Sequence, residues 1–303
     1  MIASNPANFV ISGVPEIEAD ANGNATVVWL EYQSQLTFSQ LRSARFTAST
    51  GLWEVSTLVP YVAAFGPATP SLGMDANGNM TALYAIGARS GANSSYPTAG
   101  FYAHSYNATT NTWNKPVFIT GIGIAAPNDF YLPQIEISSN GNALAIWSKN
   151  ATISSFAFNA ATNLWRPLNE LTGNTPKLGV DASGNAILVY QQFTNPGGIQ
   201  SSQLANSSNT WTNPQLVSVA GNADRFYGFT NNSSGDTAIT FGGNVSQFSA
   251  RALNASVWTA PTDENPTGSE VLVALDDSGK ALLLRYRFEI NQFILESKRV
   301  SVR

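Results

Sequence analysis

The sequence predicts an all-β fold of six successive antiparallel sheets with four strands each. Three repeated patterns predict it: a glycine-centred turn, two strands that flank this turn, and a tryptophan seven residues after an aromatic residue or leucine. The turn glycines are Gly23, Gly78, Gly141, Gly184, Gly235 and Gly279. By subtraction of these numbers they are 55, 63, 43, 51 and 44 residues apart. A spacing of about 50 residues is typical of the blades of a β-propeller.

Each turn has the composition of a short β-hairpin. The first reads Asp20-Ala-Asn-Gly23-Asn, and the others keep an Asp, Asn or Ser three residues before the glycine. Glycine adopts positive φ without steric cost, and these polar side chains bond the backbone of their own turn. We therefore expect a hairpin between the first and second strands of every blade.

The residues around the turns have strand patterns. Pro15 to Ala19 and Pro133 to Ile137 alternate in polarity before their turns, which is the period of a strand with one buried face. Ala25 to Leu30 and Ala143 to Trp147, which follow the turns, are more continuously apolar. Continuous apolar strands are buried on both faces, as in a sheet that packs between two others.

The tryptophan repeat predicts a second hairpin in each blade. The spaced pairs are Phe46 with Trp53, Tyr106 with Trp113, Phe158 with Trp165 and Leu204 with Trp211, while Arg251 takes this position before Trp258. Turn-forming residues lie between the members of each pair and indicate a connection from the third to the fourth strand. Since tryptophan buries a large surface, we interpret its repeat as a packing device.

These residues resemble the kelch propellers, whose blades carry a tyrosine and a following tryptophan at this separation. They are also similar to the Asp-box propellers of sialidases, where a tryptophan follows a turn at the same place in the blade. The kelch diglycine occurs at Gly242-Gly243. The Asp-box carboxylate is absent from the turn between the third and fourth strands in every unit. The resemblance implies one six-bladed propeller domain over residues 1–303 and no inherited activity.

The last unit stops after its third predicted strand. At the other end of the chain, Asn5 to Gly13 is similar to Asn114 to Gly121. We therefore predict that the N-terminal strand completes the C-terminal blade and closes the ring, which leaves few free sheet edges.

Composition narrows the class of protein. Hydrophobic residues make up 43% of the chain, which is enough for a sizeable core, and cysteine is absent. With 15 Lys and Arg against 19 Asp and Glu, the chain lacks the basic surface that binds nucleic acid. No apolar run reaches the roughly 18 residues that suggest membrane insertion. Abundant Asn, Ser and Thr favour a secreted or cell-surface bacterial protein, and we expect a monomer.

Variable loops are expected at the end of the blades opposite the turns. Long loops on a rigid scaffold often bind ligands, and aromatic faces with a few polar groups suit sugar rings or peptide segments. Alternatively, these aromatic rings cap the cores of their own blades. The candidate ligand-binding residues are Tyr61, Phe65, Arg89, Tyr96, Asp129, Phe130, Tyr131, Arg225, Phe226 and Arg287.

Three glutamates on predicted innermost strands are the main enzymatic candidates. Glu18 and Glu136 occupy equivalent positions of two blades, and Glu16 lies beside Glu18. Two carboxylates at a suitable distance are sufficient for glycoside hydrolysis, so a sialidase-like hydrolase is one alternative. The other interpretation is that they line a wet central channel or pair with Lys177.

No cofactor or metal site is expected. Calcium sites gather 6 to 8 oxygen ligands, whereas the turns offer one carboxylate each, apart from Asp276-Asp277. His104 is the only histidine, which excludes a multi-histidine metal site.

The sequence therefore predicts a non-catalytic recognition propeller that binds a glycan or a protein segment through its loop face. Two alternatives stay open: a glycoside hydrolase that uses the channel carboxylates, and a purely structural module of a surface protein.

Overall fold

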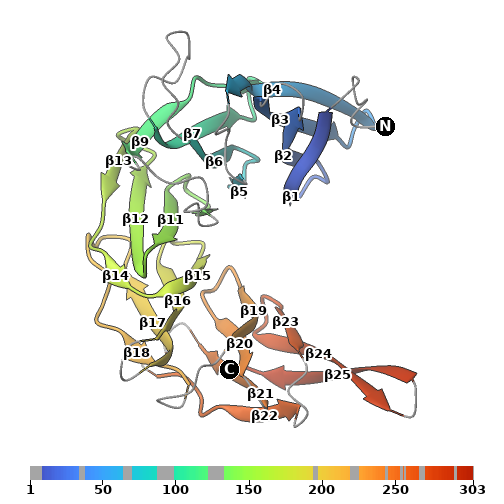
Figure 1. Ribbon diagram of the computed structural model, residues 1–303, viewed down its shortest axis with the longest axis vertical. Coiled ribbons are helices and arrows are strands. Elements are labelled where there is room, and N and C mark those ends of the chain that lie inside the picture. Colours follow the sequence, from blue (N-terminus) through green and yellow to red (C-terminus); the bar gives the residue numbers. More distant parts are fainter. Residues whose placement is uncertain are drawn as a thin grey trace. The chain divides into compact units, whose positions relative to one another are not determined.

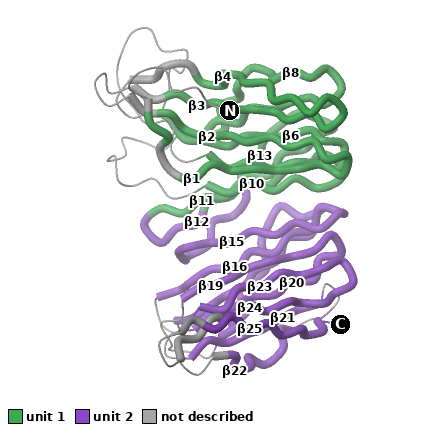
Figure 2. Tube along the Cα trace, turned by 90° about the vertical axis from the view of Figure 1, so that its right-hand side faces the viewer, with its two compact units in different colours: residues 1–149, 154–167 green, residues 150–153, 168–303 purple. Residues whose placement is uncertain are grey.

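The computed structural model describes most of the chain. The described residues are 9–33, 38–63, 70–86, 99–121, 133–193, 197–218, 225–242, 245–252, 255, 257–265, 270–289 and 292–302. The chain divides into two compact units, shown in Figure 2. Unit 1 contains residues 1–149 and 154–167, and unit 2 contains residues 150–153 and 168–303. The single domain over residues 1–303 stays a prediction.

The secondary structure confirms the all-β class. The described residues form six antiparallel sheets that follow one another along the chain from β1 to β25 (Figure 1). In these residues we find no helix with the length and apolar character needed to cross a membrane.

Unit 1 contains the first two sheets and most of the third. Sheet 1 consists of β1 (Phe9–Ala19), β2 (Ala25–Gln33), β3 (Phe38–Thr47) and β4 (Leu52–Ala63). Sheet 2 consists of β5 (Ser71–Met74), β6 (Met80–Ile86), β7 (Gly100–Asn107) and β8 (Thr112–Trp113), with β9 (Val117–Gly121) also paired to β7. Sheet 3 consists of β10 (Gln134–Ile137), β11 (Ala143–Lys149), β12 (Thr152–Asn159) and β13 (Leu164–Pro167).

Unit 2 contains the remaining sheets. The first residues of β12 pair with β14 (Leu171–Thr172). Sheet 4 consists of β15 (Asn174–Val180), β16 (Ala186–Gln192), β17 (Gly198–Leu204) and β18 (Gln215–Leu216). Sheet 5 consists of β19 (Arg225–Asn231), β20 (Thr237–Gly242), β21 (Ser246–Arg251) and β22 (Thr262–Asn265). In the described residues sheet 6 has three strands, β23 (Val271–Leu275), β24 (Lys280–Glu289) and β25 (Gln292–Ser301).

The six predicted turns are confirmed, and each joins the first two strands of its sheet. Their glycines have φ between 77° and 85°, a region that other residues rarely adopt. In the first turn, the N–H of Gly23 donates to the carbonyl oxygen of Asp20 at 3.0 Å. The Asp20 carboxylate accepts bonds from the N–H groups of Asn22 and Asn24, both at 2.9 Å. The turns therefore form from contacts within five residues of chain.

An asparagine that follows the turn glycine connects this turn to the second hairpin of the same sheet. The four side chains that do so are Asn24, Asn79, Asn142 and Asn185, which accept bonds from the backbone N–H of Ala48, Ala108, Ala160 and Asn206. The bonds are 2.9 to 3.1 Å long. We call this contact the asparagine clamp. In sheets 5 and 6 the same position holds Asp236 and Lys280.

The tryptophan spacing also produces the predicted hairpin. Phe46 and Trp53 are directly opposite each other on β3 and β4, with ring centroids 5.3 Å apart. The equivalent pairs of sheets 2 and 3 have centroid distances of 5.3 and 5.2 Å. The seven-residue separation thus places two aromatic rings side by side across a hairpin.

The hydrophobic core lies between neighbouring sheets of each unit. Buried residues of sheets 1 and 2 form one cluster, which includes Val28, Leu41 and Tyr84. A second cluster joins sheets 2 and 3, where the rings of Phe101 and Trp147 stack at 3.9 Å. In unit 2, similar clusters join sheet 4 to sheet 5 and sheet 5 to sheet 6. Within each unit, neighbouring sheets therefore pack against one another, as expected for blades.

The N-terminal strand differs from its prediction. Instead of completing sheet 6, Phe9 to Ser12 extend β1 and pair with Leu30 to Gln33 of β2. The adjacent β2 is long enough to offer these residues a partner within the same hairpin. Ring closure by residues 5–13 is therefore not shown.

Candidate functional site

Unit 1 carries carboxyl groups on the first strands of two sheets. Glu18 on β1 and Glu136 on β10 each stand two residues before the polar residue that opens the turn, Asp20 or Ser138. Their predicted equivalence is thus confirmed. The first strand of the intervening sheet, β5, contacts both β1 and β10. Its equivalent residue is Gly73.

Gly73 lets the first strands approach closely. A Cβ atom at Gly73 would lie 3.0 Å from Cγ1 of Ile137 and 3.1 Å from the carbonyl oxygen of Ile135. Because Ile135 and Ile137 flank Glu136, the glycine allows β10 to approach β5 at the level of the carboxyl group. Sheet 2 therefore has no side chain at the position that corresponds to Glu18 in sheet 1 and Glu136 in sheet 3.

Desolvation and neighbouring glutamates raise the pKa of Glu18 and of Glu136. Desolvation raises the pKa of Glu136 to about 8, and the negative charges of Glu18 and then Glu16 add to the shift. The pKa of Glu18 is also raised, first by desolvation and then by Glu16. Burial and like charges both disfavour the ionised form of a carboxyl group. At neutral pH Glu136 therefore tends to hold its proton.

Solvent reaches these carboxyl groups despite the desolvation. The Glu136 residue is exposed, and Glu16 and Glu18 are half-buried. Access to water offsets part of the desolvation that raises the pKa of Glu136. In the described part of the chain, the carboxyl groups of Glu18 and Glu136 make no hydrogen bond or ion pair. Both are available to a ligand. We call Glu16, Glu18 and Glu136 the carboxyl cluster.

Several candidates from the sequence lie in strands rather than in loops. Tyr61 belongs to β4, Arg225 and Phe226 begin β19, and Arg287 belongs to β24. The loop assignment was wrong because these strands extend further than their apolar patterns, as in β24, where Arg287 pairs with Ile294. Phe226 packs against the core shared by sheets 4 and 5, which matches the alternative interpretation of a ring that caps its own blade.

The other loop candidates lie outside the described residues. They are Phe65, Arg89, Tyr96, Asp129, Phe130 and Tyr131. Lys177 belongs to unit 2, where it is exposed on β15 and its backbone pairs with Val189. The central channel, like the pairing of Lys177 with the carboxyl cluster, stays a prediction.

His104 has the environment of a structural residue. It is buried on β7, and its Nδ1 lies 3.3 Å from the hydroxyl oxygen of Tyr84. Desolvation lowers the pKa of His104 to about 4, so the ring stays neutral at ordinary pH. In the described residues, no group of three or more His, Asp or Glu side chains could hold a metal ion.

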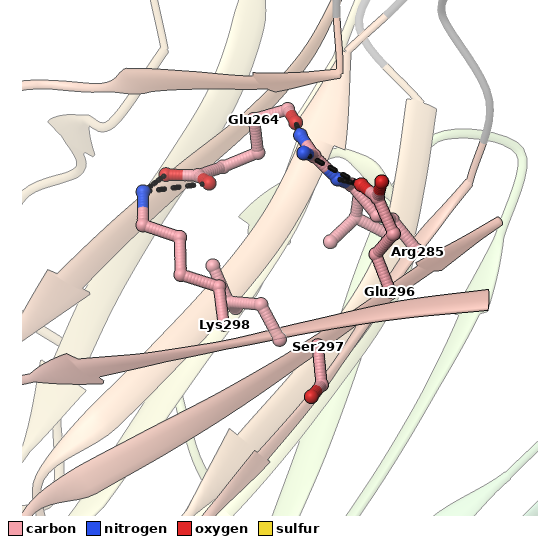
Figure 3. A pocket seen from close by; sticks show the side chains of 7 residues that line it. Glu264, Arg285, Glu296, Ser297 and Lys298 are labelled. Carbon is pink, nitrogen blue, oxygen red and sulfur yellow. Dashed lines mark hydrogen bonds and ion pairs between the residues drawn. The ribbon is translucent and has the colours of Figure 1, made fainter. Parts of the chain in front are cut away.

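Unit 2 contains a pocket that the sequence analysis missed. Its volume is about 410 Å³, and strands β22 to β25 supply its lining (Figure 3). The lining residues are Glu264, Val271, Leu283, Arg285, Glu296, Ser297 and Lys298. Two apolar side chains, those of Val271 and Leu283, are almost fully buried. We call this cavity the unit 2 pocket.

Two ion pairs hold the charged side chains of the unit 2 pocket. The Nζ atom of Lys298 lies 3.0 and 2.9 Å from the two carboxylate oxygens of Glu264. Arg285 donates from Nε to Oε2 of Glu296 at 2.8 Å, and its guanidinium also bonds the backbone carbonyl of Glu264. Figure 3 shows Glu264 in contact with both cations. One signal was present in the sequence, because Arg285 interrupts the apolar run of β24.

Comparison with known proteins identifies the fold. No protein-family model matches the chain, and no curated protein matches it in sequence. Among solved structures, the β-propeller domain of the Trilobed protease from Pyrococcus furiosus matches with a TM-score of 0.55 and 9% identity. The match covers 98% of this chain and 85% of that one. That domain is described as having an open velcro topology.

Two carbohydrate-related proteins have similar structures. The polysaccharide lyase Uly1 matches with a TM-score of 0.52 and 13% identity, over 95% of this chain and 81% of the lyase. The SapL1 lectin, solved in complex with alpha methyl fucoside, matches with a TM-score of 0.50 and 13% identity, over 94% of this chain and 96% of the lectin. At such identities the similarity shows the fold alone. With its six antiparallel sheets, the chain has a β-propeller fold.

Proposed function

We propose that this β-propeller binds carbohydrate, with Glu18 and Glu136 as hydrogen-bonding partners of sugar hydroxyl groups. One observation carries the proposal: two solvent-accessible carboxyl groups stand at equivalent positions of two blades and have no hydrogen-bond or ion-pair partner in the described residues. The shared fold of a lectin and a polysaccharide lyase supports a carbohydrate ligand.

The chemistry of the two carboxyl groups fits sugar hydroxyl groups. A hydroxyl group both donates and accepts hydrogen bonds, and a protonated carboxyl group does the same. The raised pKa of Glu136 keeps a donor O–H at neutral pH, within electrostatic range of the acceptor oxygens of Glu18. Both side chains project from strands, which hold binding groups more precisely than loops do.

A glycan array followed by calorimetric titration tests the proposal. The variants are Glu18→Gln and Glu136→Gln, with Glu54→Gln on β4 as an exposed control from the same unit. Since hydrogen bonds to charged or strongly polar groups contribute about 1.5–3 kcal/mol, at least one cluster variant should weaken binding about tenfold or more. The control should bind as the unaltered protein does.

Two results would contradict the proposal. One is a glycan that binds equally well to both cluster variants. The other is an array without any bound glycan, which would favour a protein-segment ligand or a structural module instead.

Glycoside hydrolysis is a second candidate, which the raised pKa of Glu136 favours. A general acid must hold its proton near the working pH, and a second carboxylate must serve as nucleophile or base. Glu136 and Glu18 would take these roles. In an assay with fluorogenic glycosides, Glu136→Gln should abolish turnover while a bound glycan is retained. If the unaltered protein turns over no glycoside, the hydrolase hypothesis fails and the binding hypothesis is unaffected.

A further inference from the structure

Sheet 5 has two polar residues where other sheets have an apolar cross-strand pair. In sheets 1, 2 and 4, the residue seven positions before the tryptophan lies opposite an apolar residue of the second strand. These pairs are Phe46 with Ala25, Tyr106 with Met80 and Leu204 with Ala186. In sheet 5 the same position holds Arg251 on β21, opposite Thr237 on β20. Arg251 is 7% and Thr237 is 0% exposed, so a charged residue occupies a buried position.

The side chain of Arg251 lies on the face of sheet 5 that packs toward sheet 4. Successive strand side chains alternate between the two faces, so Thr237 shares its face with Ile239 and Phe241. Both of these residues belong to the core cluster of sheets 4 and 5. Residues directly opposite each other on paired strands share a face, which places Arg251 beside the same core.

The charge of Arg251 has no counter-ion within the described residues. Its side chain makes no hydrogen bond or ion pair there, and neither its buried Nε nor the buried Oγ1 of Thr237 has a hydrogen-bond partner. Desolvation lowers the pKa of Arg251 below its ordinary value. By contrast, Arg285 and Lys298 of the same unit lie 2.8 and 2.9 Å from carboxylate oxygens. Since an unpaired buried charge is costly, an anion from solution would gain by pairing with Arg251.

The end of the Arg251 side chain can be reached from solvent. Nε is the guanidinium nitrogen that is buried without a partner, whereas the two terminal nitrogens, which also lack one, are not buried. A ligand can therefore meet these two nitrogens at the surface. It need not displace Ile239 or Phe241, which are both 0% exposed.

The chemistry of the guanidinium group indicates which anion fits. Its N–H donors lie in one plane and match the two oxygens of a carboxylate, which can accept two parallel hydrogen bonds. One positive charge balances the single negative charge of a carboxylate. A phosphate group, with a charge of about −1.5 to −2 at neutral pH, would keep part of its charge unpaired.

From these features we infer that Arg251 binds a carboxylate group, carried by an acidic sugar or by a free organic acid. The two terminal nitrogens donate to the two carboxylate oxygens. This contact belongs to unit 2 and does not depend on the carboxyl cluster of unit 1.

NMR of the full chain with isotope-labelled arginine tests the contact directly. The buried Nε–H of Arg251 should exchange slowly with water, and its resonance is identified by its absence from the spectrum of Arg251→Leu. Acetate, glucuronate, phosphate and glucose are added separately, at an ionic strength matched with sodium chloride. We expect glucuronate, or both carboxylates, to shift this resonance at concentrations about tenfold or more below those at which phosphate or chloride does.

A leucine variant separates binding from folding. Arg251→Leu introduces the residue type that sheet 4 has at this position, Leu204, so the fold should be retained. Thermal melts compare this variant with its parent in a Glu18→Gln, Glu136→Gln background, where the carboxyl cluster is altered in both proteins. The carboxylate that shifts the resonance should raise the melting temperature of the parent and not that of the variant, because binding stabilises the folded state. Arg299→Leu, at an exposed arginine of β25, is the matched control and should respond as the parent does.

The outcomes separate this inference from the proposed function. It is overturned if no carboxylate shifts the Arg251 resonance, or if glucose, phosphate or chloride shifts it at the same concentrations. A folded Arg251→Leu variant that responds to carboxylates as its parent does would also overturn it. A response to glucuronate alone assigns an acidic sugar as the ligand, and an equal response to acetate assigns any carboxylate. If Glu18→Gln and Glu136→Gln bind glycans normally but Arg251 still responds, the proposed function fails and this contact stands.

Discussion

Units 1 and 2 place acidic side chains in opposite electrostatic settings. In unit 1, Glu18 and Glu136 stand near other glutamates, and the pKa of each is raised. In unit 2, the buried Glu264 is neutralised by Lys298 at 2.9 Å. Like charges make ionisation costly, whereas an opposite charge stabilises the ionised form. The same acidic residue type therefore faces like charges in one unit and an oppositely charged partner in the other.

The largest expected effect comes from breaking the ion pair of unit 2. Glu264→Ala removes a buried carboxylate and leaves Lys298 without it. Loss of a buried pair costs about 3–5 kcal/mol, but Lys298 is partly exposed, so we expect about 2 kcal/mol. Urea unfolding measures the change. Glu270→Ala, an exposed residue just before β23, is the control and should change stability by less than about 0.5 kcal/mol.

A smaller loss is expected where unit 1 brings its strands together. Gly73→Ala adds a methyl group 3.1 Å from the backbone oxygen of Ile135, and backbone cannot move away as a flexible side chain can. We expect destabilisation of about 1–2 kcal/mol in urea unfolding. The pKa of Glu136 should fall as β10 moves away from the other glutamates, which NMR titration measures. An unchanged pKa together with unchanged stability would show that Gly73 does not set this spacing.

The smallest predicted change in stability is a gain rather than a loss. Because the pKa of Glu136 in the folded protein, about 8, lies above its ordinary value of 4.5, the folded state holds this proton more tightly. The resulting stability is fully present below pH 4.5 and is lost as the pH rises through about 8. Glu136→Gln should therefore stabilise the protein at pH 9, by about 1 kcal/mol or less because the side chain is exposed.

The pH dependence provides the control for Glu136. At pH 4 the variant and the unaltered protein should unfold at nearly the same temperature, since Glu136 is then protonated in both states. Stabilisation that is equal at pH 4 and pH 9 would mean that the charge of Glu136 is not its cause.

Local chemistry made the repeat predictable. The turn at Gly23 is fixed by bonds from residues within the same turn, so its sequence is sufficient to identify it. The spacing of Tyr106 and Trp113 likewise specifies a cross-strand pair. The equivalence of Glu18 and Glu136 followed from counting back from the turns.

Strand length and the unit 2 pocket were less predictable. Tyr61 and Arg287 were assigned to loops because polar residues near strand ends resemble loop sequence, although hydrogen bonding extends β4 and β24 past them. The pocket joins Glu264 of β22 to Lys298 of β25, which are 34 residues apart. Periodicity predicts the face on which a side chain lies, but not which distant strand it meets. Arg285 within the apolar run of β24 was the available signal.

The asparagine clamp has a consequence for how such a chain diverges. Since Asn79 bonds Ala108 within one sheet, the two hairpins of that repeat are joined at this corner by a contact of their own. Insertions elsewhere in a repeat then leave the anchored corner intact, which fits turn glycines that are 43 to 63 residues apart by subtraction of their numbers. The loops at one end of each sheet can therefore lengthen while the turns at the asparagine clamp keep their length, so insertions gather in the loops away from the clamp.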